Sequence, residues 1–211
     1  MRKKERAEKA VELLEKLYPD AICSLNYTDA FQLLIATRLS AQCTDKRVNM
    51  VTPDLFKEFP TAEKMAIAEL KRIEELIKTC GLYKTKAKDL IGIAQMITEN
   101  FGGKVPDTIE ELTTLPGVGR KTANLVCGDI YKKPAVVTDT HFIRICNRLG
   151  FVDTTNPLSV ETQMRKLLPP KKSNDFCHRT VLFGRDICTA RTAKCDECVL
   201  KEICPKKIKA K

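Results

Sequence analysis

The chain has 211 residues and a formal net charge of +10, with 37 Lys and Arg residues against 27 Asp and Glu residues. This length fits one or two compact domains, and a hydrophobic content of 43% suffices for a buried core. The longest apolar stretches are far too short to cross a bilayer, and the charged N-terminus lacks the apolar segment of a signal peptide, so we expect neither a membrane protein nor a secreted one. The surplus of positive charge indicates a polyanionic partner such as nucleic acid.

Helical periodicity runs through almost the whole chain, and no segment alternates apolar and polar residues cleanly enough to predict a half-buried strand. Residues 1–17 combine charged residues with apolar ones at helical spacing. The apolar positions within residues 90–101 are spaced four, three and four apart, so they share one helix face, and Gly102-Gly103 predict the end of that helix. We therefore predict an all-α fold.

Three further helices are predicted in the second half of the chain. Asp107-Thr-Ile-Glu110 has the spacing of a capping box, which predicts a helix that is capped by Asp107. Residues 142–149 carry an apolar stripe at helical spacing. Asn156-Pro157 is typical of a helix cap followed by the first helical position.

A glycine-rich hairpin is predicted at Leu115-Pro-Gly-Val-Gly, between two helical patterns. Gly117 and Gly119 leave no side chain between the backbone amides and an approaching ligand. A hairpin that opens into a helix at Gly119 presents amide groups and the positive end of the helix dipole to a phosphate. The alternative is a tight turn between packed helices. A mononucleotide P-loop is excluded, because its G-x4-G-K-[ST] spacing and its preceding strand are both missing.

Four cysteines near the C-terminus form a C-x6-C-x2-C-x5-C series, and a proline follows the last of them. Four thiols within so short a segment indicate a metal or cluster site. Zinc usually takes two closely spaced pairs, whereas this series contains one C-x2-C pair. The spacing favours a 4Fe-4S cluster, with zinc as the alternative. The predicted ligands are Cys188, Cys195, Cys198 and Cys204.

The remaining cysteines are scattered and mostly fall on apolar helix faces, where a free thiol packs as a small hydrophobe. They are Cys23, Cys43, Cys80, Cys127, Cys146 and Cys177. Basic residues also gather at both ends of the chain, where we expect frayed, solvated termini rather than a dedicated binding arm. These residues are Arg2, Lys3, Lys4, Arg6, Lys9, Lys206, Lys207, Lys209 and Lys211.

Several motifs together resemble one known family. LPGVGRKTANLV from Leu115, VVTDTHFIRICNRLG from Val136 and the four-cysteine series closely resemble the endonuclease III family, the iron-sulfur DNA glycosylases and abasic-site lyases of the helix-hairpin-helix superfamily. LLIATRLSAQCTD from Leu33 and CGLYKTKA from Cys80 extend the resemblance over nearly the whole chain.

The resemblance implies a fold of two helical domains with a substrate cleft between them. A six-helix barrel with the helix-hairpin-helix would span residues 25–134. A discontinuous domain would combine residues 1–24 with 135–211 and carry the 4Fe-4S cluster at residues 188–204.

The resemblance also implies the catalytic residues. Lys121 matches the nucleophile of the family, and an amine that attacks the anomeric carbon forms a Schiff base that makes β-elimination easy. Asp139 matches the catalytic aspartate, and its surroundings in the sequence also predict a helix N-cap. A capped carboxylate stays ionised, so it can activate the nucleophile or stabilise positive charge on the sugar, and both roles remain open.

A glycosylase must take its target nucleotide out of the stack, and other side chains must fill the gap. The resemblance gives this role to Gln42 and Leu82. We expect Arg191 and Lys194, in the loop between the first two cysteines of the series, to bind phosphates. The full set of predicted DNA-binding residues is Gln42, Leu82, Gly117, Val118, Gly119, Arg120, His141, Arg191 and Lys194.

The resemblance thus predicts a monomeric base-excision-repair enzyme that removes oxidised pyrimidines from duplex DNA. We expect it in the cytoplasm, associated with the nucleoid in a bacterium or archaeon. The related adenine glycosylase typically has serine at the position of Lys121 and a further C-terminal domain, so Lys121 and the short tail argue against it. A third possibility is a non-catalytic DNA-binding module held together by zinc.

Overall fold

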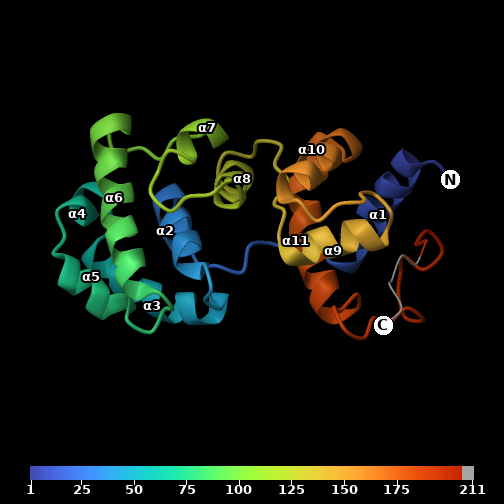
Figure 1. Cartoon of the computed structure of the whole chain (residues 1–211), viewed down its shortest axis with the longest axis horizontal. Coiled ribbons are helices and arrows are strands. Elements are labelled where there is room, and N and C mark those ends of the chain that lie inside the picture. Colours follow the sequence, from blue (N-terminus) through green and yellow to red (C-terminus); the bar gives the residue numbers. More distant parts are fainter. Residues whose placement is uncertain (206–211) are drawn as a thin grey trace. The chain divides into compact units, whose positions relative to one another are not determined.

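The computed structural model describes residues 1–205; the lysines predicted to lie in a solvated terminus at 206, 207, 209 and 211 fall outside the described residues. All regular secondary structure within residues 1–205 is helical, which confirms the all-α prediction (Figure 1). No helix in that range is long and apolar enough to cross a membrane. The contacts divide the chain into two compact units, one from Cys23 to Tyr131 and one that joins Met1–Ile22 to the chain from Lys132 onward.

The unit Cys23–Tyr131 contains seven helices. They are α2 (Ala30–Ser40), α3 (Asp45–Glu58), α4 (Ala62–Ala66), α5 (Leu70–Ile77), α6 (Tyr83–Phe101), α7 (Ile109–Leu112) and α8 (Arg120–Asp129). The longest helix, α6, packs against α2, α4 and α5, and α2 also packs against α3 and α8 (Figure 1). Leu90, Ala94 and Ile97 on α6 are fully buried, as their spacing predicts. Gly102 ends this helix in a left-handed conformation with φ +58°.

Side-chain caps begin most of these helices, and one of them differs from the prediction. Thr108, not Asp107, caps α7: its hydroxyl accepts from the Glu111 amide at 3.2 Å and donates to the Glu111 carboxylate at 2.6 Å. The prediction of Asp107 was wrong because both candidates are followed three residues later by a glutamate. Spacing alone cannot rank two overlapping capping boxes.

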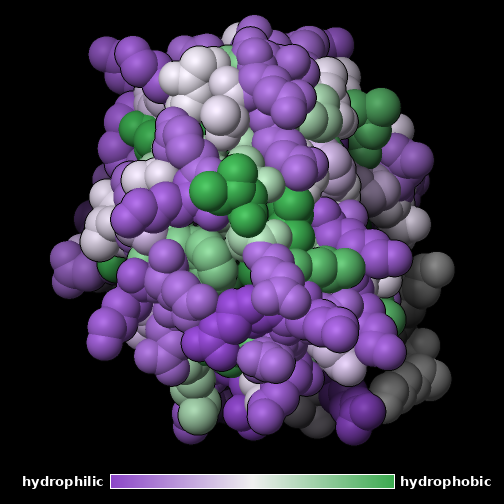
Figure 2. Space-filling view, turned by 90° about the vertical axis from the view of Figure 1, so that its left-hand side faces the viewer, coloured by the Kyte–Doolittle hydropathy of each residue, from purple (hydrophilic) through white to green (hydrophobic). Residues whose placement is uncertain are grey.

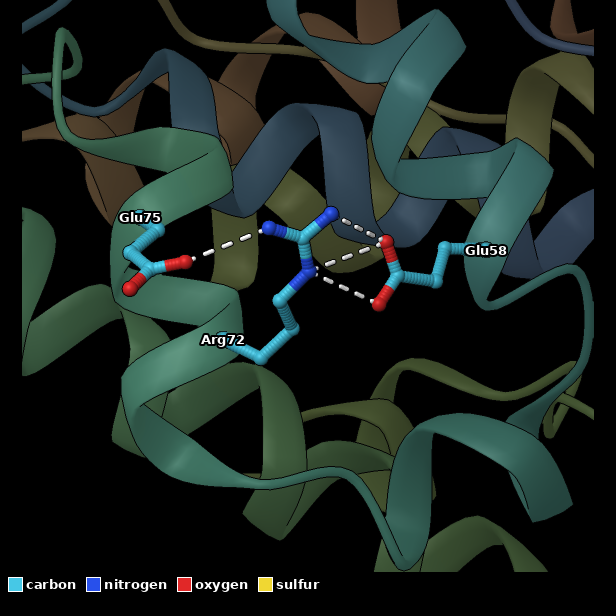
Figure 3. A network of polar contacts seen from close by, with 3 residues as sticks. All are labelled: Glu58, Arg72 and Glu75. Carbon is cyan, nitrogen blue, oxygen red and sulfur yellow. Dashed lines mark hydrogen bonds and ion pairs between the residues drawn. The ribbon is translucent and has the colours of Figure 1, made fainter.

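Arg72 on α5 ties that helix to the end of α3 (Figure 3). Its guanidinium donates to both carboxylate oxygens of Glu58 at 2.8–3.1 Å and to Glu75 at 3.2 Å. The hydrogen bonds from Arg72 lower the pKa of Glu58. This network links α3 to α5, and the turns that carry Gln42 and Leu82 lie before α3 and after α5.

The face of this unit that carries α4, α5 and α6 is largely polar. Figure 2 shows a small group of apolar side chains surrounded by hydrophilic ones. The most exposed large apolar residue in the described chain is Ile67, at the end of α4, with 87% of its surface accessible. Isolated apolar residues of this kind are ordinary on protein surfaces, so they indicate no partner.

The described part of the other unit, residues 1–22 and 132–205, contains five helical segments. They are α1 (Lys3–Leu17), α9 (Thr140–Arg148), α10 (Pro157–Leu167), the short 3-10 helix η1 (Pro170–Lys172) and α11 (Ser173–Asp186). Helix α11 packs against α9 and α1, and the rings of Phe142 and Phe176 meet edge to face at 6.1 Å. Asn156 caps α10 by accepting from the Ser159 amide at 3.0 Å, which confirms the predicted cap. The four-cysteine series follows α11 in irregular backbone.

Candidate functional site

The hairpin at residues 115–119 joins α7 to α8 and opens into α8 at Gly119, as predicted. Gly117 has φ +66°, a conformation that favours glycine. The amide of Val118 donates to the carbonyl of Leu115 at 3.1 Å, and the buried Val118 side chain anchors the turn. Gly119 is the N-cap of α8 and has no side chain with which to cap the first-turn amides. This arrangement suits the binding of an anion.

The ion pair of Arg38 and Asp89 lies against the backbone of the hairpin. Arg38 on α2 donates through Nε to Oδ2 of Asp89 on α6 at 2.9 Å, and its Nη2 makes a second, short contact to the same oxygen. The two side chains are only 13% and 19% exposed. A Cβ atom on Gly117 would lie 2.8 Å from Asp89 Oδ2 and closer still to Arg38 Nε. The backbone of the turn therefore rests directly on this ion pair.

Lys121 lies in the first turn of α8, and its side chain is exposed. The pKa of the nearby Cys23 thiol is raised to about 12, mainly by burial. The charges of Asp129 and Asp45 also raise this pKa, whereas the charge of Lys121 lowers it. Cys23 thus lies within electrostatic reach of Lys121. The hydroxyl of Ser24 donates to Asp45 at 2.5 Å, which ties the segment that carries Cys23 to the start of α3. An exposed amine at a helix N-terminus has the access that a nucleophile needs.

Asp139 caps α9, as predicted: its Oδ1 accepts from the Phe142 amide at 2.7 Å. Its other carboxylate oxygen makes no hydrogen bond or ion pair with any residue in the range 1–205. The backbone that leads to it is fixed, because the Val137 amide donates to Cys177 Sγ at 3.3 Å. Asp139 and Lys121 belong to different units of the chain.

His141 is half-buried on α9 and packs against α11. Its Nδ1 lies 3.2 Å from Nη2 of Arg144. Nη2 of Arg144 also donates to the Gly184 carbonyl at 3.0 Å. Burial lowers the pKa of His141; Asp139 opposes this shift, while Arg144 and Arg185 add to it. His141 is therefore neutral at neutral pH and can offer DNA a hydrogen bond but not a charge.

Gln42 and Leu82 lie on two turns that contact each other. Both side chains are exposed, and both residues adopt a left-handed conformation, with φ +54° and +58°, that is uncommon outside glycine. A Cβ atom on Gly81 would lie 3.2 Å from the carbonyl oxygen of Gln42. We call residues 41–43 and 80–82 the paired turns. The structure thus brings the two predicted DNA-inserting residues together within one unit.

The four cysteines of the C-terminal series line a single cavity, together with apolar side chains such as Phe183 and Leu200 and with Arg148 and Lys194. Burial raises the pKa of Cys198, and the other three cysteines raise it further, so the four thiols are close neighbours. Within residues 1–205, however, no group of three or more His, Cys, Asp or Glu residues is arranged to hold a single metal ion.

Arg148 on α9 is hydrogen-bonded into the start of the cysteine loop. Its guanidinium donates to Cys188 Sγ at 3.2 Å, to the Thr189 carbonyl at 2.7 Å and to the Ala190 carbonyl at 3.0 Å. Arg144, on the same helix, donates to the Cys188 carbonyl at 3.0 Å. The sequence reasoning missed both arginines, because each lies on the polar side of an amphipathic helix and its partners are distant in the sequence.

Arg191 and Lys194 are exposed in the loop between the first two cysteines. The hydroxyl of Thr189 accepts from the Thr192 amide at 3.2 Å and donates to its carbonyl at 2.5 Å, which closes a turn around Arg191. The Lys194 amide donates to the Ile187 carbonyl at 3.0 Å. Neither basic side chain forms an ion pair with the part of the chain that the structure describes, so both can pair with phosphates.

Comparison with known proteins relates this arrangement to a family. Residues 35–170 match the family described as HhH-GPD superfamily base excision DNA repair protein. The chain is 47% identical over 204 residues to endonuclease III of Synechocystis sp., which covers 96% of this chain and 93% of that protein. It is 37% identical to endonuclease III of Escherichia coli, with 95% and 97% covered.

Solved structures give the same relationship. A trapped endonuclease III–DNA covalent intermediate matches the chain with a TM-score of 0.90 at 38% identity, covering 98% of this chain and 97% of that one. A non-covalent endonuclease III–DNA complex matches equally well. A thermostable thymine-DNA glycosylase, 23% identical with a TM-score of 0.86, shares the fold.

Proposed function

The chain belongs to the HhH-GPD superfamily of base excision DNA repair proteins, and within it to the endonuclease III family, and on that premise we propose that Lys121 and Asp139 carry out its reaction. Endonuclease III is a DNA glycosylase with abasic-site lyase activity, so the protein is a bifunctional enzyme of base excision repair. The family also indicates that oxidised pyrimidines are the substrates and that a Schiff base is the intermediate.

Lys121 supplies the nucleophile. Its amine attacks C1′ of the damaged nucleotide, a C–N bond forms, and the glycosidic bond to the base breaks. The amine then loses a proton and the C1′–O4′ bond breaks, which opens the sugar ring and gives the Schiff base. The Schiff base makes the C2′ proton acidic, and loss of that proton breaks the C3′–O bond, so the 3′ phosphate leaves and the strand is cut. The exposure of Lys121 at the start of α8, two residues after Gly119, is the observation that carries this proposal.

Asp139 supplies the carboxylate. One of its oxygens is held by the α9 amide, while the other is available to activate the nucleophile or to stabilise positive charge on the sugar. A carboxylate held in this way needs no reorganisation when the charge develops, which makes it an effective electrostatic group.

Duplex DNA with a damaged pyrimidine or an abasic site is the partner we propose. The hairpin amides of Gly117, Gly119 and Arg120 would bind one phosphate, since the Val118 amide already donates to Leu115. The exposed Arg191 and Lys194 would bind others. Gln42 and Leu82 project from the paired turns and would fill the space that the flipped nucleotide leaves. His141 would add an uncharged contact.

The cysteine cavity offers the four thiolates that a 4Fe-4S cluster takes as ligands. The C-x6-C-x2-C-x5-C spacing favours this cluster over zinc, which usually takes two closely spaced pairs. Cys188, Cys195, Cys198 and Cys204 would therefore hold the cluster, which would act as a structural element that fixes the loop carrying Arg191 and Lys194.

We further propose that residues 25–134, whose seven helices include the four-residue α7, form the barrel domain of the family and that residues 1–24 and 135–211 form the cluster domain. The enzyme would act as a monomer, on DNA inside the cell and in contact with the nucleoid. Sedimentation equilibrium of the purified protein, with and without duplex DNA, tests the monomeric state. A dimer would give twice the protein mass of the monomer.

Borohydride trapping tests the proposed chemistry. Reduction of the Schiff base should give a covalent adduct between the protein and a duplex that contains an oxidised pyrimidine. Lys121→Gln should abolish this adduct, whereas Lys132→Gln, which changes another exposed lysine, should trap as the native protein does. No adduct with the native protein, or full trapping by Lys121→Gln, would show that the lyase assignment is wrong.

Elemental analysis tests the proposed cofactor. The purified holoprotein should contain iron and sulfide and show the visible absorbance of a cluster. Zinc in place of iron would overturn this assignment and would favour the alternative of a zinc-held DNA-binding module, provided that the protein also fails to nick DNA.

A further inference from the structure

Two cysteines that the proposed reaction does not use face each other in the paired turns. Cys43 follows Gln42 and Cys80 precedes Gly81, the two residues whose backbones lie in contact. Burial raises the pKa of Cys80, and the thiol of Cys43 raises it further, so the two thiols are close neighbours. Cys80 is only 1% exposed, whereas Cys43 is partly exposed, so one member of the pair can meet a reagent from solution.

A buried lysine lies beside these thiols. Lys86 is fully buried, and its Nζ donates to the Leu39 carbonyl, near the end of α2, at 2.7 Å. The charge of Lys86 is felt by both thiols, and Arg47 also acts on Cys80. Neighbouring cations stabilise a thiolate, which is the reactive form of cysteine. These cations oppose the effect of burial, which raises the pKa of Cys80 and lowers that of Lys86.

We propose that Cys43 and Cys80 are a modification site. A small disulfide, such as glutathione disulfide, oxidises the two thiols to an intramolecular disulfide. This disulfide cross-links the paired turns and blocks their insertion into DNA. The effect on DNA rests on the proposed function, in which Gln42 and Leu82 enter the duplex. The formation of the cross-link rests only on the two thiols.

The reaction proceeds in two exchanges. Cys43 loses its proton and attacks glutathione disulfide, forming a mixed disulfide and releasing one glutathione. Cys80 then attacks the sulfur of Cys43 and releases the second glutathione, so two thiols are oxidised while one glutathione disulfide is reduced to two glutathiones. Burial above all raises the pKa of Cys80 to about 11, and the interaction with Cys43 adds to this, so Cys80 is the weaker first nucleophile. Cys43 therefore reacts first.

The cross-link should matter because it would stop the paired turns from moving apart. Gln42 and Leu82 already hold left-handed conformations that only the surrounding structure maintains. A disulfide fixes its two Cα atoms about 4.4–6.8 Å apart and resists further adjustment. The two turns could then no longer move apart around a nucleotide that leaves the stack.

Peptide mapping of the full chain, with its cluster in place, tests the cross-link. The protein is incubated with glutathione disulfide, its remaining thiols are alkylated, and it is digested with trypsin without reduction. We expect a linked pair of peptides, residues 39–46 and residues 79–84, that dithiothreitol separates. Absence of this pair, under conditions in which Cys43 becomes glutathionylated, would overturn the proposal.

Activity measurements on the same samples test the consequence. Base release should fall by about tenfold or more on oxidation, since a shift of about 1 Å in a positioning group can cost up to ~100-fold in rate, and dithiothreitol should restore it. Cys43→Ala, compared with its own reduced form, should show no such reversible loss. Cys80→Ala should stop at the mixed disulfide of Cys43 with glutathione and give no linked peptides. The visible absorbance of the cluster should stay constant throughout.

The outcomes separate this proposal from the proposed function. If the reduced protein has no glycosylase activity, the proposed function fails, while the peptide map still decides whether the cross-link forms. If the cross-link forms and an active enzyme keeps its full rate, the cross-link exists but the claim that it blocks DNA insertion is wrong.

Discussion

Asp89 leaves no room for a side chain on Gly117: a Cβ atom there would lie 2.8 Å from Oδ2 of Asp89. Since Asp89 is paired with Arg38, it cannot move away without breaking a partly buried ion pair. Gly117 also has φ +66°, which side chains disfavour. Two features therefore restrict the shape of the hairpin: the left-handed conformation of Gly117 and the ion pair that lies against it.

Gly117→Ala should therefore distort the hairpin. We expect a loss of stability of about 1–3 kcal/mol, as is typical of overpacking, together with weaker binding of duplex DNA. Gly119→Ala is the matched control, because Gly119 has φ −93° and no atom lies within 4 Å of the added Cβ. Gly119→Ala should unfold with a free energy within about 0.5 kcal/mol of that of the native protein. It should still bind DNA more weakly if a phosphate approaches these amides. Thermal unfolding and DNA titration check both variants; native behaviour of Gly117→Ala would contradict the argument.

The parts of the site that sequence predicts are those encoded locally. The hairpin at Gly117 and the cap at Asp139 follow from residue types a few positions apart, and the structure has both. The paired turns show the limit of such reasoning. Neither Gln42 nor Leu82 is a glycine, so nothing in their sequence indicates a left-handed conformation, which depends on contacts between segments distant in the chain.

Charged partners far apart in the sequence could not be predicted either. Arg38 and Arg148 each lie within a helix, and each binds a partner that its own helix does not contain. A helix pattern places a side chain on a face but does not identify what packs against that face. Such contacts depend on how the helices are arranged, which one sequence without relatives does not reveal.

Asp139→Asn should separate the two roles of this residue. Asparagine caps a helix about as well as aspartate, so the stability of α9 should stay nearly unchanged. The loss of charge should lower base release by about 100- to 1,000-fold if the carboxylate stabilises the transition state. Single-turnover kinetics on a duplex with one oxidised pyrimidine, measured beside thermal unfolding, checks both statements. Unchanged turnover would show that Asp139 serves only as the N-cap of α9.

The stability of the protein should depend on the titration of His141. Burial lowers the pKa of His141 in the folded protein, whereas the unfolded chain should have the ordinary value of about 6.5. Its contribution to stability is therefore fully present above about pH 6.5 and is lost as the pH falls below that value toward the folded-state pKa. Asparagine does not titrate, so the native protein should lose more stability than His141→Asn between about pH 8 and about pH 5. Identical pH profiles of unfolding would contradict this prediction.

Arg148 and Arg191 should affect the cysteine loop in different ways. Arg148 donates to Cys188 Sγ at 3.2 Å and to two carbonyls of the loop, so Arg148→Met should loosen the loop and lower iron retention. Loss of a hydrogen bond to a ligand sulfur should also lower the reduction potential of the bound cluster. Iron content after gel filtration and the potential of the holoprotein measure these effects.

Arg191→Met is the matched control, because this exposed arginine makes no ion pair within residues 1–205. It should retain its iron in full, while the slope of log K for DNA against log salt concentration should fall by about one unit, the effect of losing one phosphate contact. If Arg148→Met keeps its iron as well as Arg191→Met does, the hydrogen bonds of Arg148 do not stabilise the cluster loop. If Arg191→Met leaves the salt dependence unchanged, this loop does not contact the phosphates through Arg191.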